Sequence, residues 1–128
     1  MKNLELGGFE AMWCEDKDGI LIVSVSGDVD LYSARRLREL LWRAKGQTSD
    51  APPRVVVDLC GVEFIDTAGL EVLLEEWNTS RQSDGRICLV APPGGAVRRL
   101  LELSGLGELI DLYAELGVAL DSCALVTA

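Results

Sequence analysis

Residues 55–70 of the chain are VVVDLCGVEFIDTAGL, and this stretch decides the fold. Its three leading valines are continuously apolar rather than alternating, which is typical of a strand that is covered on both faces in an α/β layer. A short turn is predicted next, and then a hydroxyl residue, Thr67, stands at the start of a helix. The apolar positions of that helix have the i, i+3, i+4, i+7 spacing of an amphipathic helix: Leu70, Leu73, Leu74 and Trp77.

Further strands and helices are predicted on both sides of this stretch. Two apolar runs, residues 9–14 and 20–25, flank a turn signal and predict an antiparallel hairpin. Ser33 is expected to cap a helix that runs through about Lys45 and ends at Gly46. The elements expected later in the chain are strands at residues 87–90 and 109–112, a helix after residues 92–95 and a last helix at residues 115–124.

This order of elements predicts a single α/β domain over residues 1–128, with its core at about residues 9–120. We expect a mixed β-sheet of four to five strands with an N-terminal antiparallel hairpin and about four helices. Crossover connections put loops and helix N-termini at the carboxyl ends of parallel strands, where α/β proteins usually place their sites. The two loops predicted there are residues 27–33 and 61–70.

The charge of the chain limits its partners. Its formal net charge is −9, which argues against a nucleic-acid partner, because phosphate binding needs clustered Lys and Arg. An anionic membrane surface would also repel the chain, so no direct membrane contact is expected. The sign of the charge favours a protein partner with a basic patch. Since no apolar leader or membrane-spanning run is recognised, a cytoplasmic location is expected.

The residue types argue against a catalytic or metal site. The chain has no histidine, which removes Ser-His-Asp and Cys-His arrangements and the commonest metal ligand. We therefore expect no enzymatic activity, no metal and no cofactor. The four cysteines contain no Cys-x-x-Cys pair and are interpreted as small hydrophobic residues in a reducing compartment. An even number of cysteines is also compatible with disulfides, although no secretory leader supports that alternative.

Two interpretations of Asp66 and Thr67 are open. In the structural one, either side chain accepts a backbone N–H of the first helical turn. In the functional one, Thr67 is a phosphate acceptor beside the free N–H groups of the helix start, where an added anion is favoured. Phosphorylation would then change docking without unfolding the domain. Glu71 and Glu75 lie one turn apart. A solvated face is the simpler interpretation, and the alternative is that they extend the acidic run from Asp66 into a docking surface.

Asp28 and Asp30 form a second candidate, directly after the strand at residues 20–25. A solvated turn is the simpler interpretation. An aspartyl-phosphate enzyme is disfavoured because Tyr32 replaces the Thr or Val expected there and none of the three lysines follows a later strand. The same absence of lysine argues against a phospho-accepting receiver domain built on Asp58.

Three blocks of the sequence resemble the STAS domain, the module of sulfate transporters and anti-sigma factor antagonists. They are residues 26–34 (SGDVDLYSA), 57–70 (VDLCGVEFIDTAGL) and 97–106 (VRRLLELSGL). The blocks run in family order and cover most of the chain. The first is especially similar to free-standing bacterial antagonists of anti-sigma factors, known as anti-anti-sigma factors.

The resemblance implies a switch by partner exchange. In the family, the residue after the Asp of an Asp-Ser-x-Gly-Leu motif is phosphorylated by the anti-sigma factor, which is itself a serine kinase. That position is Thr67, which replaces the commoner serine, and Ala68 leaves no second hydroxyl in the motif. The unphosphorylated form is expected to sequester the anti-sigma factor and free a sigma factor for transcription, and phosphorylation to release the partner. A PP2C-type phosphatase then resets the switch.

The residues expected to contact the partner surround Thr67 in the matched blocks. Three of them, Asp28, Asp30 and Asp66, are expected to position a basic group of the partner or the metal-bound nucleotide of the kinase. The full set is Asp28, Asp30, Tyr32, Ser33, Asp66, Ala68, Gly69, Leu70 and Glu71.

The alternative function is a cytosolic STAS subunit of a membrane transporter ATPase complex, because some such proteins also carry Asp-Thr-Ala-Gly-Leu. The tyrosine-containing loop at residues 27–34 favours the antagonist. We expect a monomer or a weak dimer. Trp13, Trp42 and Trp77 are expected to be core or half-buried residues, and an exposed one would indicate an interface.

Overall fold

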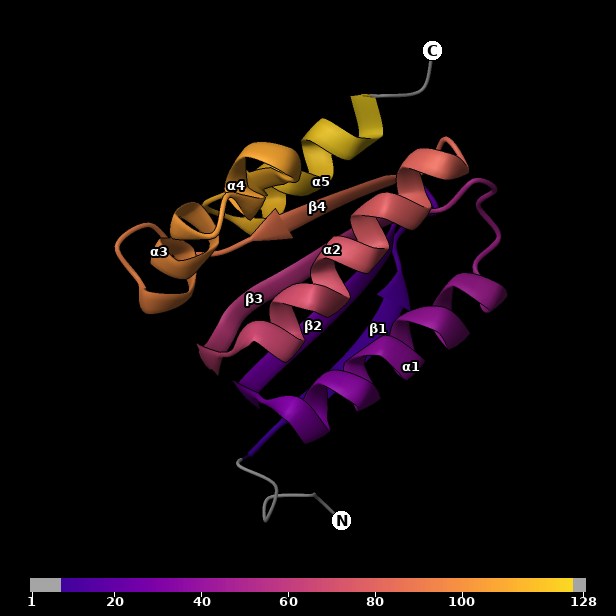
Figure 1. Cartoon of the computed structure of the whole chain (residues 1–128). Coiled ribbons are helices and arrows are strands. Elements are labelled where there is room, and N and C mark those ends of the chain that lie inside the picture. The colour runs from indigo at the N-terminus through magenta and orange to yellow at the C-terminus, as the bar shows by residue number, and fades with distance from the viewer. Residues whose placement is uncertain (1–7, 126–128) are drawn as a thin grey trace.

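Five strands form one mixed sheet in the computed structural model, which describes residues 8–125 (Figure 1). Their order across the sheet is their order along the chain: β1 (Glu10–Glu15), β2 (Leu21–Val29), β3 (Arg54–Ile65), β4 (Arg86–Val90) and β5 (Asp111–Tyr113). β1 pairs with β2 in antiparallel orientation, and the later pairs are parallel. The predicted mixed sheet with an N-terminal antiparallel hairpin is therefore confirmed.

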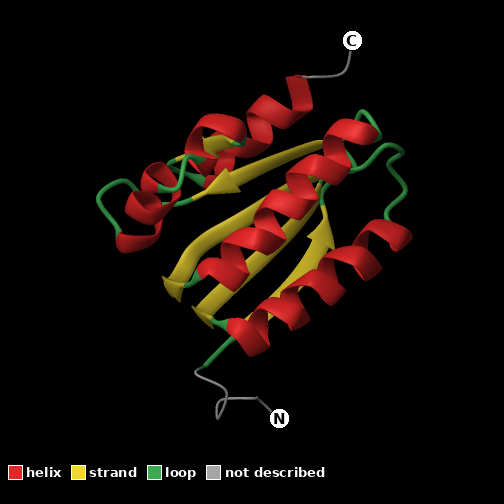
Figure 2. Cartoon of the chain, viewed as in Figure 1, coloured by secondary structure: helices red, strands yellow, loops and turns green. Residues whose placement is uncertain are grey.

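Helices lie on both faces of this sheet (Figures 1 and 2). The long helices α1 (Leu31–Gln47) and α2 (Thr67–Gln82) cover one face, and α5 (Leu116–Leu125) lies on the other. Two short helices, α3 (Ala96–Leu103) and α4 (Leu106–Leu109), connect β4 to β5. The helix α4 was not predicted and occupies the start of the strand expected at residues 109–112, because the buried Leu106 turns the chain inward directly after Gly105, which has a φ of 86°.

The valine run of β3 is buried on both sides, as its lack of alternation predicts. Val55 and Val57 face the larger hydrophobic core beneath α1 and α2. Val56 faces a smaller core beneath α5, which contains Cys88 and Cys123. All three valines are fully buried, so β3 is the central strand that both layers of helices need.

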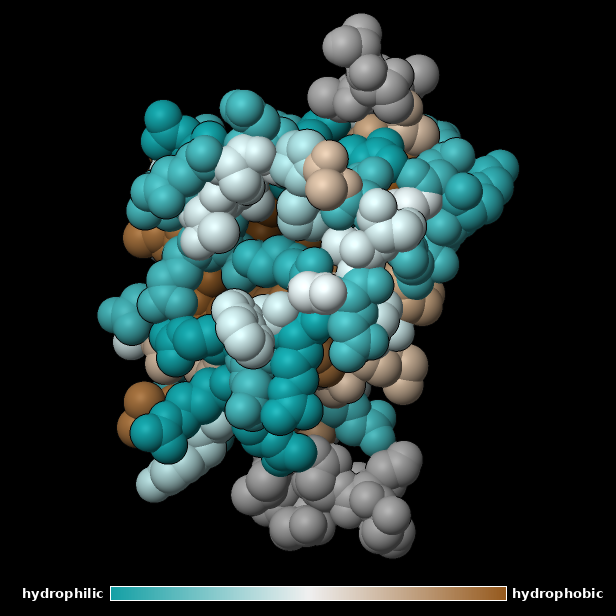
Figure 3. All heavy atoms as spheres, turned by 90° about the vertical axis from the view of Figure 1, so that its right-hand side faces the viewer, coloured by the Kyte–Doolittle hydropathy of each residue, from teal (hydrophilic) through white to brown (hydrophobic). Residues whose placement is uncertain are grey.

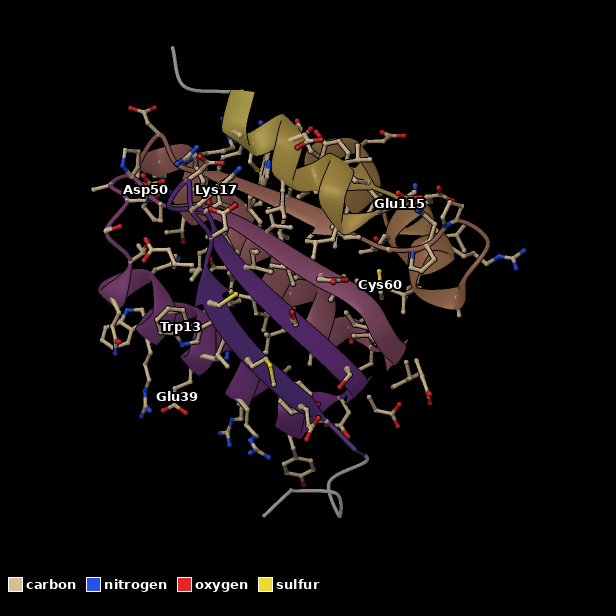
Figure 4. All side chains as sticks on the ribbon, turned by 180° about the vertical axis from the view of Figure 1, so that it is seen from behind. Trp13, Lys17, Glu39, Asp50, Cys60 and Glu115 are labelled. Atoms are coloured by element: carbon tan, nitrogen blue, oxygen red, sulfur yellow. The ribbon has the colours of Figure 1, made fainter. Side chains whose placement is uncertain are left out.

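The hairpin half of the sheet has no helix on its second face (Figure 4). Met12, Cys14 and Ser24 are exposed there, whereas Trp13, the neighbour of Met12 on β1, packs against the larger core on the other face. One covered and one uncovered face explain why β1 alternates and β3 does not.

Each of the two segments predicted as a loop consists of a strand end, an N-cap residue and a helix start, so the prediction of loops is wrong, although both segments lie at the carboxyl ends of their strands. β2 continues through Val29 and β3 through Ile65. The strands remain paired across a shift in register between Gly27 and Asp28. Gly27 has a φ of 87°, and a side chain on it would collide with the backbone that precedes β1. The glycine that signals a turn in the sequence therefore marks an irregularity inside a strand.

The ends of α1 also differ from the prediction. Its N-cap is Asp30, and Ser33 is the third helical residue. Asp30 is the N-cap because its backbone is extended and its carboxylate accepts hydrogen bonds from the N–H groups of the first turn. At the other end, Gly46 stays within the helix, and Thr48 is the C-cap in an extended conformation. Gly46 is therefore not the helix stop that its residue type suggests.

The side of the molecule on which α1 and α2 end is mostly hydrophilic (Figure 3). Trp42 on α1 is nevertheless 75% exposed, whereas Trp13 and Trp77 are half-buried. The expectation for the tryptophans thus holds for two of the three. None of the helices within residues 8–125 combines the length and the apolar character that crossing a membrane requires.

Candidate functional site

Helices α1 and α2 both begin at the same edge of the sheet (Figure 1). Val29 and Ile65, the last residues of β2 and β3, are partners in the parallel register. The N–H of Asp66 donates to the carbonyl of Val29 over 3.1 Å. Asp30 and Asp66 follow these strands and are the N-caps of α1 and α2. Two segments that lie far apart in the sequence therefore meet at one place.

Asp66, rather than Thr67, caps α2. Its Oδ1 accepts from the N–H of Ala68 over 2.9 Å and from the N–H of Gly69 over 3.3 Å. Thr67 is the first helical residue and is exposed, and its hydroxyl makes no hydrogen bond within the part of the chain that the structure describes. Two N–H groups expected to be free beside Thr67 are thus already bonded to Asp66. The hydroxyl itself is open to a modifying enzyme.

A capping box holds the start of α1. The Oδ1 atom of Asp30 accepts from the N–H groups of Tyr32 and Ser33, each over 3.0 Å. In return, Ser33 Oγ accepts from the Asp30 N–H over 2.8 Å and donates to the carbonyl of Asp28 over 2.8 Å. The hydrogen bond from the Ser33 N–H is the main cause that lowers the pKa of Asp30. Ser33 is 3% exposed, so it supports the site from inside and does not face a partner.

Gly69 lets α2 approach the ends of β2 and β3 closely. A Cβ atom at this position would lie 2.6 Å from Cγ1 of Ile65 and 2.8 Å from Cγ1 of Val29. Its neighbours Ala68 and Leu70 are half-buried and pack against the larger core. These three predicted contact residues therefore help to place Thr67 at the sheet edge.

The exposed residues around Thr67 include two that sequence reasoning missed. Tyr32 and Glu71, which were predicted, are exposed, and Tyr32 has 71% of its surface accessible. Leu31 and Phe64 were not predicted, and they are 62% and 51% exposed. The alternation of Phe64 with the buried Ile65 was the available signal, because it shows Phe64 on the outer face once residues 61–65 are assigned to a strand.

An open groove of about 420 Å³ runs from Phe64 to α3. Leu100 and Leu103 of α3 line it, and Leu103 is 76% exposed. Arg99 supplies a positive charge at the groove. The carboxyl edge of the sheet thus presents apolar surface next to the acidic helix caps.

The acidic face predicted on α2 is partly neutralised by α1. Glu75 forms a two-pronged ion pair with Arg38, with N–O distances of 2.8 and 3.1 Å. Glu76 is buried and pairs with Lys45, with Nζ 2.8 Å from Oε1. Of the two glutamates predicted to extend the acidic surface, Glu75 is thus paired, and the charge of Glu71 also acts on Arg38. The acidic surface is therefore smaller than the sequence suggests.

The side chains at this edge limit the chemistry that it can supply. Within residues 8–125, no group of three or more His, Cys, Asp or Glu side chains is placed to hold a metal ion. Although Cys60 is exposed, partial desolvation of its thiol, followed by a hydrogen bond with Asp58, raises the pKa to about 11, so it is a poor nucleophile at neutral pH. What the edge offers is an accessible hydroxyl beside carboxylates and exposed apolar side chains.

The chain is similar in sequence to known anti-sigma factor antagonists. The chain is 32% identical over 105 residues to the anti-sigma-F factor antagonist RsfB of Mycobacterium tuberculosis, with 82% of each chain covered. It is also 32% identical over 101 residues to the anti-sigma F factor antagonist of Paenibacillus polymyxa, covering 77% of this chain and 82% of that one.

Solved structures show the same architecture. The crystal structure of an anti-sigma factor antagonist from Mycobacterium paratuberculosis matches with a TM-score of 0.78 and 32% identity, covering 91% of this chain and 95% of that one. The anti-sigma factor antagonist SpoIIAA in its unphosphorylated form matches with a TM-score of 0.73 at 18% identity, covering 93% of this chain and all of that one, which shows the fold alone. The STAS domain model matches residues 13–119. Because this match spans most of the sequence, the chain belongs to the STAS domain family.

Proposed function

We propose that this chain is a free-standing anti-sigma factor antagonist, a binding protein of the cytoplasm rather than an enzyme. In its unphosphorylated form it sequesters an anti-sigma factor and so releases a sigma factor for transcription. The names of relatives that are 32% identical over most of their length support this function. The observation that carries it is the exposed Thr67 hydroxyl at the first position of α2.

The switch that we propose is phosphorylation of Thr67 by the anti-sigma factor acting as a serine kinase, with a PP2C-type phosphatase as the resetting enzyme. Phosphate adds about −1.5 to −2 charge at neutral pH. The cap of α2 is formed by Asp66 and not by the Thr67 hydroxyl, so the modification removes no hydrogen bond that holds the helix. The helix start tolerates the added negative charge.

Phosphorylation is therefore expected to weaken binding to the partner rather than the fold of the chain. A doubly negative group within ~5 Å of a partner's carboxylate costs a few kcal/mol at an effective dielectric near 20. Since each ~1.4 kcal/mol is tenfold in affinity, one phosphate weakens docking by on the order of a hundredfold. The carboxylates of Asp30 and Asp66 stand at the two adjacent helix starts. They make the local potential negative before any phosphate is added.

The docking surface that we propose is the carboxyl edge of the sheet around Thr67. Leu31, Tyr32 and Phe64 are its exposed apolar side chains, and aromatic residues of this kind often dominate interface energetics. Asp28 is half-buried beside them. Asp28→Asn is expected to weaken binding to the partner by removing a negative charge. Asp30→Asn also removes a negative charge, and its asparagine side chain still caps α1.

The switch is tested with purified chain, cognate anti-sigma factor and ATP. We expect mass spectrometry to find phosphate on Thr67, and Thr67→Ala to accept none and to bind constitutively. Thr67→Glu is expected to fold, by circular dichroism, and to bind poorly. Thr79→Glu is the matched control, because Thr79 is exposed on the same helix about three turns away. Phosphate on another residue, or equal binding by Thr67→Glu and Thr79→Glu, would contradict the proposal.

The partner is identified by capture. A tagged Thr67→Ala chain, expected to hold its partner permanently, is expected to recover an anti-sigma factor from a lysate of the source cells. Recovery of a membrane transporter ATPase in its place would support the alternative function as a transporter subunit.

A further inference from the structure

Two buried cysteines meet between β4 and α5, on the face of the sheet opposite α1 and α2. The Sγ atoms of Cys88 and Cys123 lie 3.3 Å apart. Both side chains are fully buried in the smaller core, whereas the other two cysteines, Cys14 and Cys60, are exposed. All four are free thiols. A pair of sulfur atoms in contact differs from the isolated small hydrophobic residues that the sequence predicts.

The backbone around Cys123 is held in place by side chains of the sheet. Nη1 of Arg54 donates to the carbonyl of Cys123 over 3.3 Å, and Nη1 of Arg86 donates to the carbonyl of Ser122 over 3.1 Å. The hydroxyls of Tyr113 and Ser122 are 2.6 Å apart. A disulfide has an S–S distance of about 2.05 Å, so the two sulfur atoms must approach by about 1.2 Å while this frame stays in place.

The two thiols differ in acidity. The hydrogen bond between the two thiols, together with the charges of Arg86 and Arg54, lowers the pKa of Cys123. The same hydrogen bond and burial raise the pKa of Cys88. The lowered pKa and the nearby Arg54 and Arg86 favour Cys123 as the thiol that attacks an oxidant, which leaves Cys88 to resolve the product.

We propose that Cys88 and Cys123 form a redox modification site, at which a peroxide converts the dithiol into a disulfide that ties α5 to β4. In the first step the Cys123 thiolate attacks one oxygen of hydrogen peroxide, the O–O bond breaks, and hydroxide leaves to become water with the proton that Cys123 gave up. In the second step the Cys88 sulfur attacks the sulfur of the Cys123 sulfenic acid. The S–S bond forms, the S–O bond breaks, and the hydroxyl leaves as water with the Cys88 proton.

The electron balance is complete with the peroxide as the oxidant. The two thiols lose two electrons and two protons, and one hydrogen peroxide is reduced to two waters. Because neither sulfur is exposed, the peroxide reaches them only when α5 opens locally. The fully buried residues of α5 in the smaller core are Ala119 and Cys123, and Leu116, Leu120 and Ala124 are partly buried beside them. We therefore expect the buried pair to react more slowly than Cys14.

This site lies far from Thr67 and does not depend on the proposed function. Cys88 is paired with Val56 in β3. Ile65, the last residue of β3, lies nine residues beyond Val56, and Thr67 follows shortly after it. At about 3.3 Å per residue, the separation is up to about 30 Å. The disulfide is thus expected to fasten the C-terminal helix without changing phosphorylation at Thr67.

The experiment uses a Cys14→Ser/Cys60→Ser chain, in which the buried pair supplies the only thiols. The folded protein is treated with hydrogen peroxide, the peroxide is removed, and the unfolded chain is alkylated and weighed without reductant. We expect a loss of two hydrogen atoms and no alkylation, and two alkylations after reduction. Peptide mapping should join the segments that contain Cys88 and Cys123. Wild-type chain with its exposed thiols blocked serves the same purpose if the double variant does not fold.

Thermal unfolding is the second measurement. The oxidised form is expected to melt at a higher temperature than the reduced form, since the cross-link restricts the unfolded chain. The same background with Cys123→Ala should show no such redox-dependent difference. Two alkylated thiols after peroxide treatment, addition of oxygen without a cross-link, or a disulfide between two chains would each overturn the proposal.

Discussion

Substitution of Gly69 by alanine tests how α2 is seated on the sheet. Glycine to alanine is normally favourable inside a helix, by up to about 1 kcal/mol. At this position the new Cβ would stand 2.6 Å from Cγ1 of Ile65 and 2.8 Å from Cγ1 of Val29. Both distances are shorter than carbon atoms tolerate, so the start of α2 must move away from the sheet.

The structure gives the size of the effect. Ile65 and Val29 are β-branched, and they are 3% and 0% exposed, so neither can rotate out of the way. Overpacking a core costs about 1–3 kcal/mol, and two stiff neighbours favour the upper half of that range. After subtraction of the gain in helix propensity, we expect Gly69→Ala to lower the free energy of unfolding by about 1–2 kcal/mol.

The assay is urea unfolding followed by circular dichroism, with Gly46→Ala as the matched control. Gly46 is also helical, and no heavy atom lies within 4 Å of the position of its Cβ. That variant is expected to be neutral or stabilised by up to about 1 kcal/mol. In a Val29→Ala background the cost of Gly69→Ala should fall, because the added methyl fills the space that the valine leaves. A Gly69→Ala chain as stable as wild type would refute the reasoning.

Two more predictions concern charges near the helices. Because hydrogen bonds lower the pKa of Asp30 in the folded chain, its carboxylate stabilises the fold above the unfolded pKa of about 3.9, and this stabilisation is lost as the pH falls through the lower folded value. Wild type and Asp30→Asn should therefore differ in unfolding free energy at neutral pH and converge in acid, and a constant difference would contradict this. Glu76→Gln is expected to cost about 1–3 kcal/mol in urea unfolding, because it leaves the Lys45 ammonium without an opposite charge while only 16% of its side chain is exposed. Glu75→Gln should cost no more than about 0.5 kcal/mol, since its pair with Arg38 is about half exposed, and the reverse order would show that burial does not set the strength of these pairs.

The sequence by itself determined the order of the strands and of every helix except α4, as well as the place of the candidate acceptor. The unbroken apolar run of Val55, Val56 and Val57 predicts a strand covered on both faces, and Thr67 lies at the helix start where the residue pattern puts it. These features depend on neighbours within one or two turns of the chain, and such local preferences are written in the residue types. The same local pattern misplaced the C-terminal end of β2. Gly27 signals a turn in the sequence, but pairing with β3 keeps it inside the strand.

Only the tertiary structure decided which distant residues meet. Asp30 and Asp66 come together because Val29 pairs with Ile65 across the sheet. Cys88 and Cys123 are 35 residues apart in the sequence and in contact in the fold. The physical reason is that the spacing of apolar residues shows only which side of a helix or strand faces the core. The other element against which that side packs depends on how the whole chain folds.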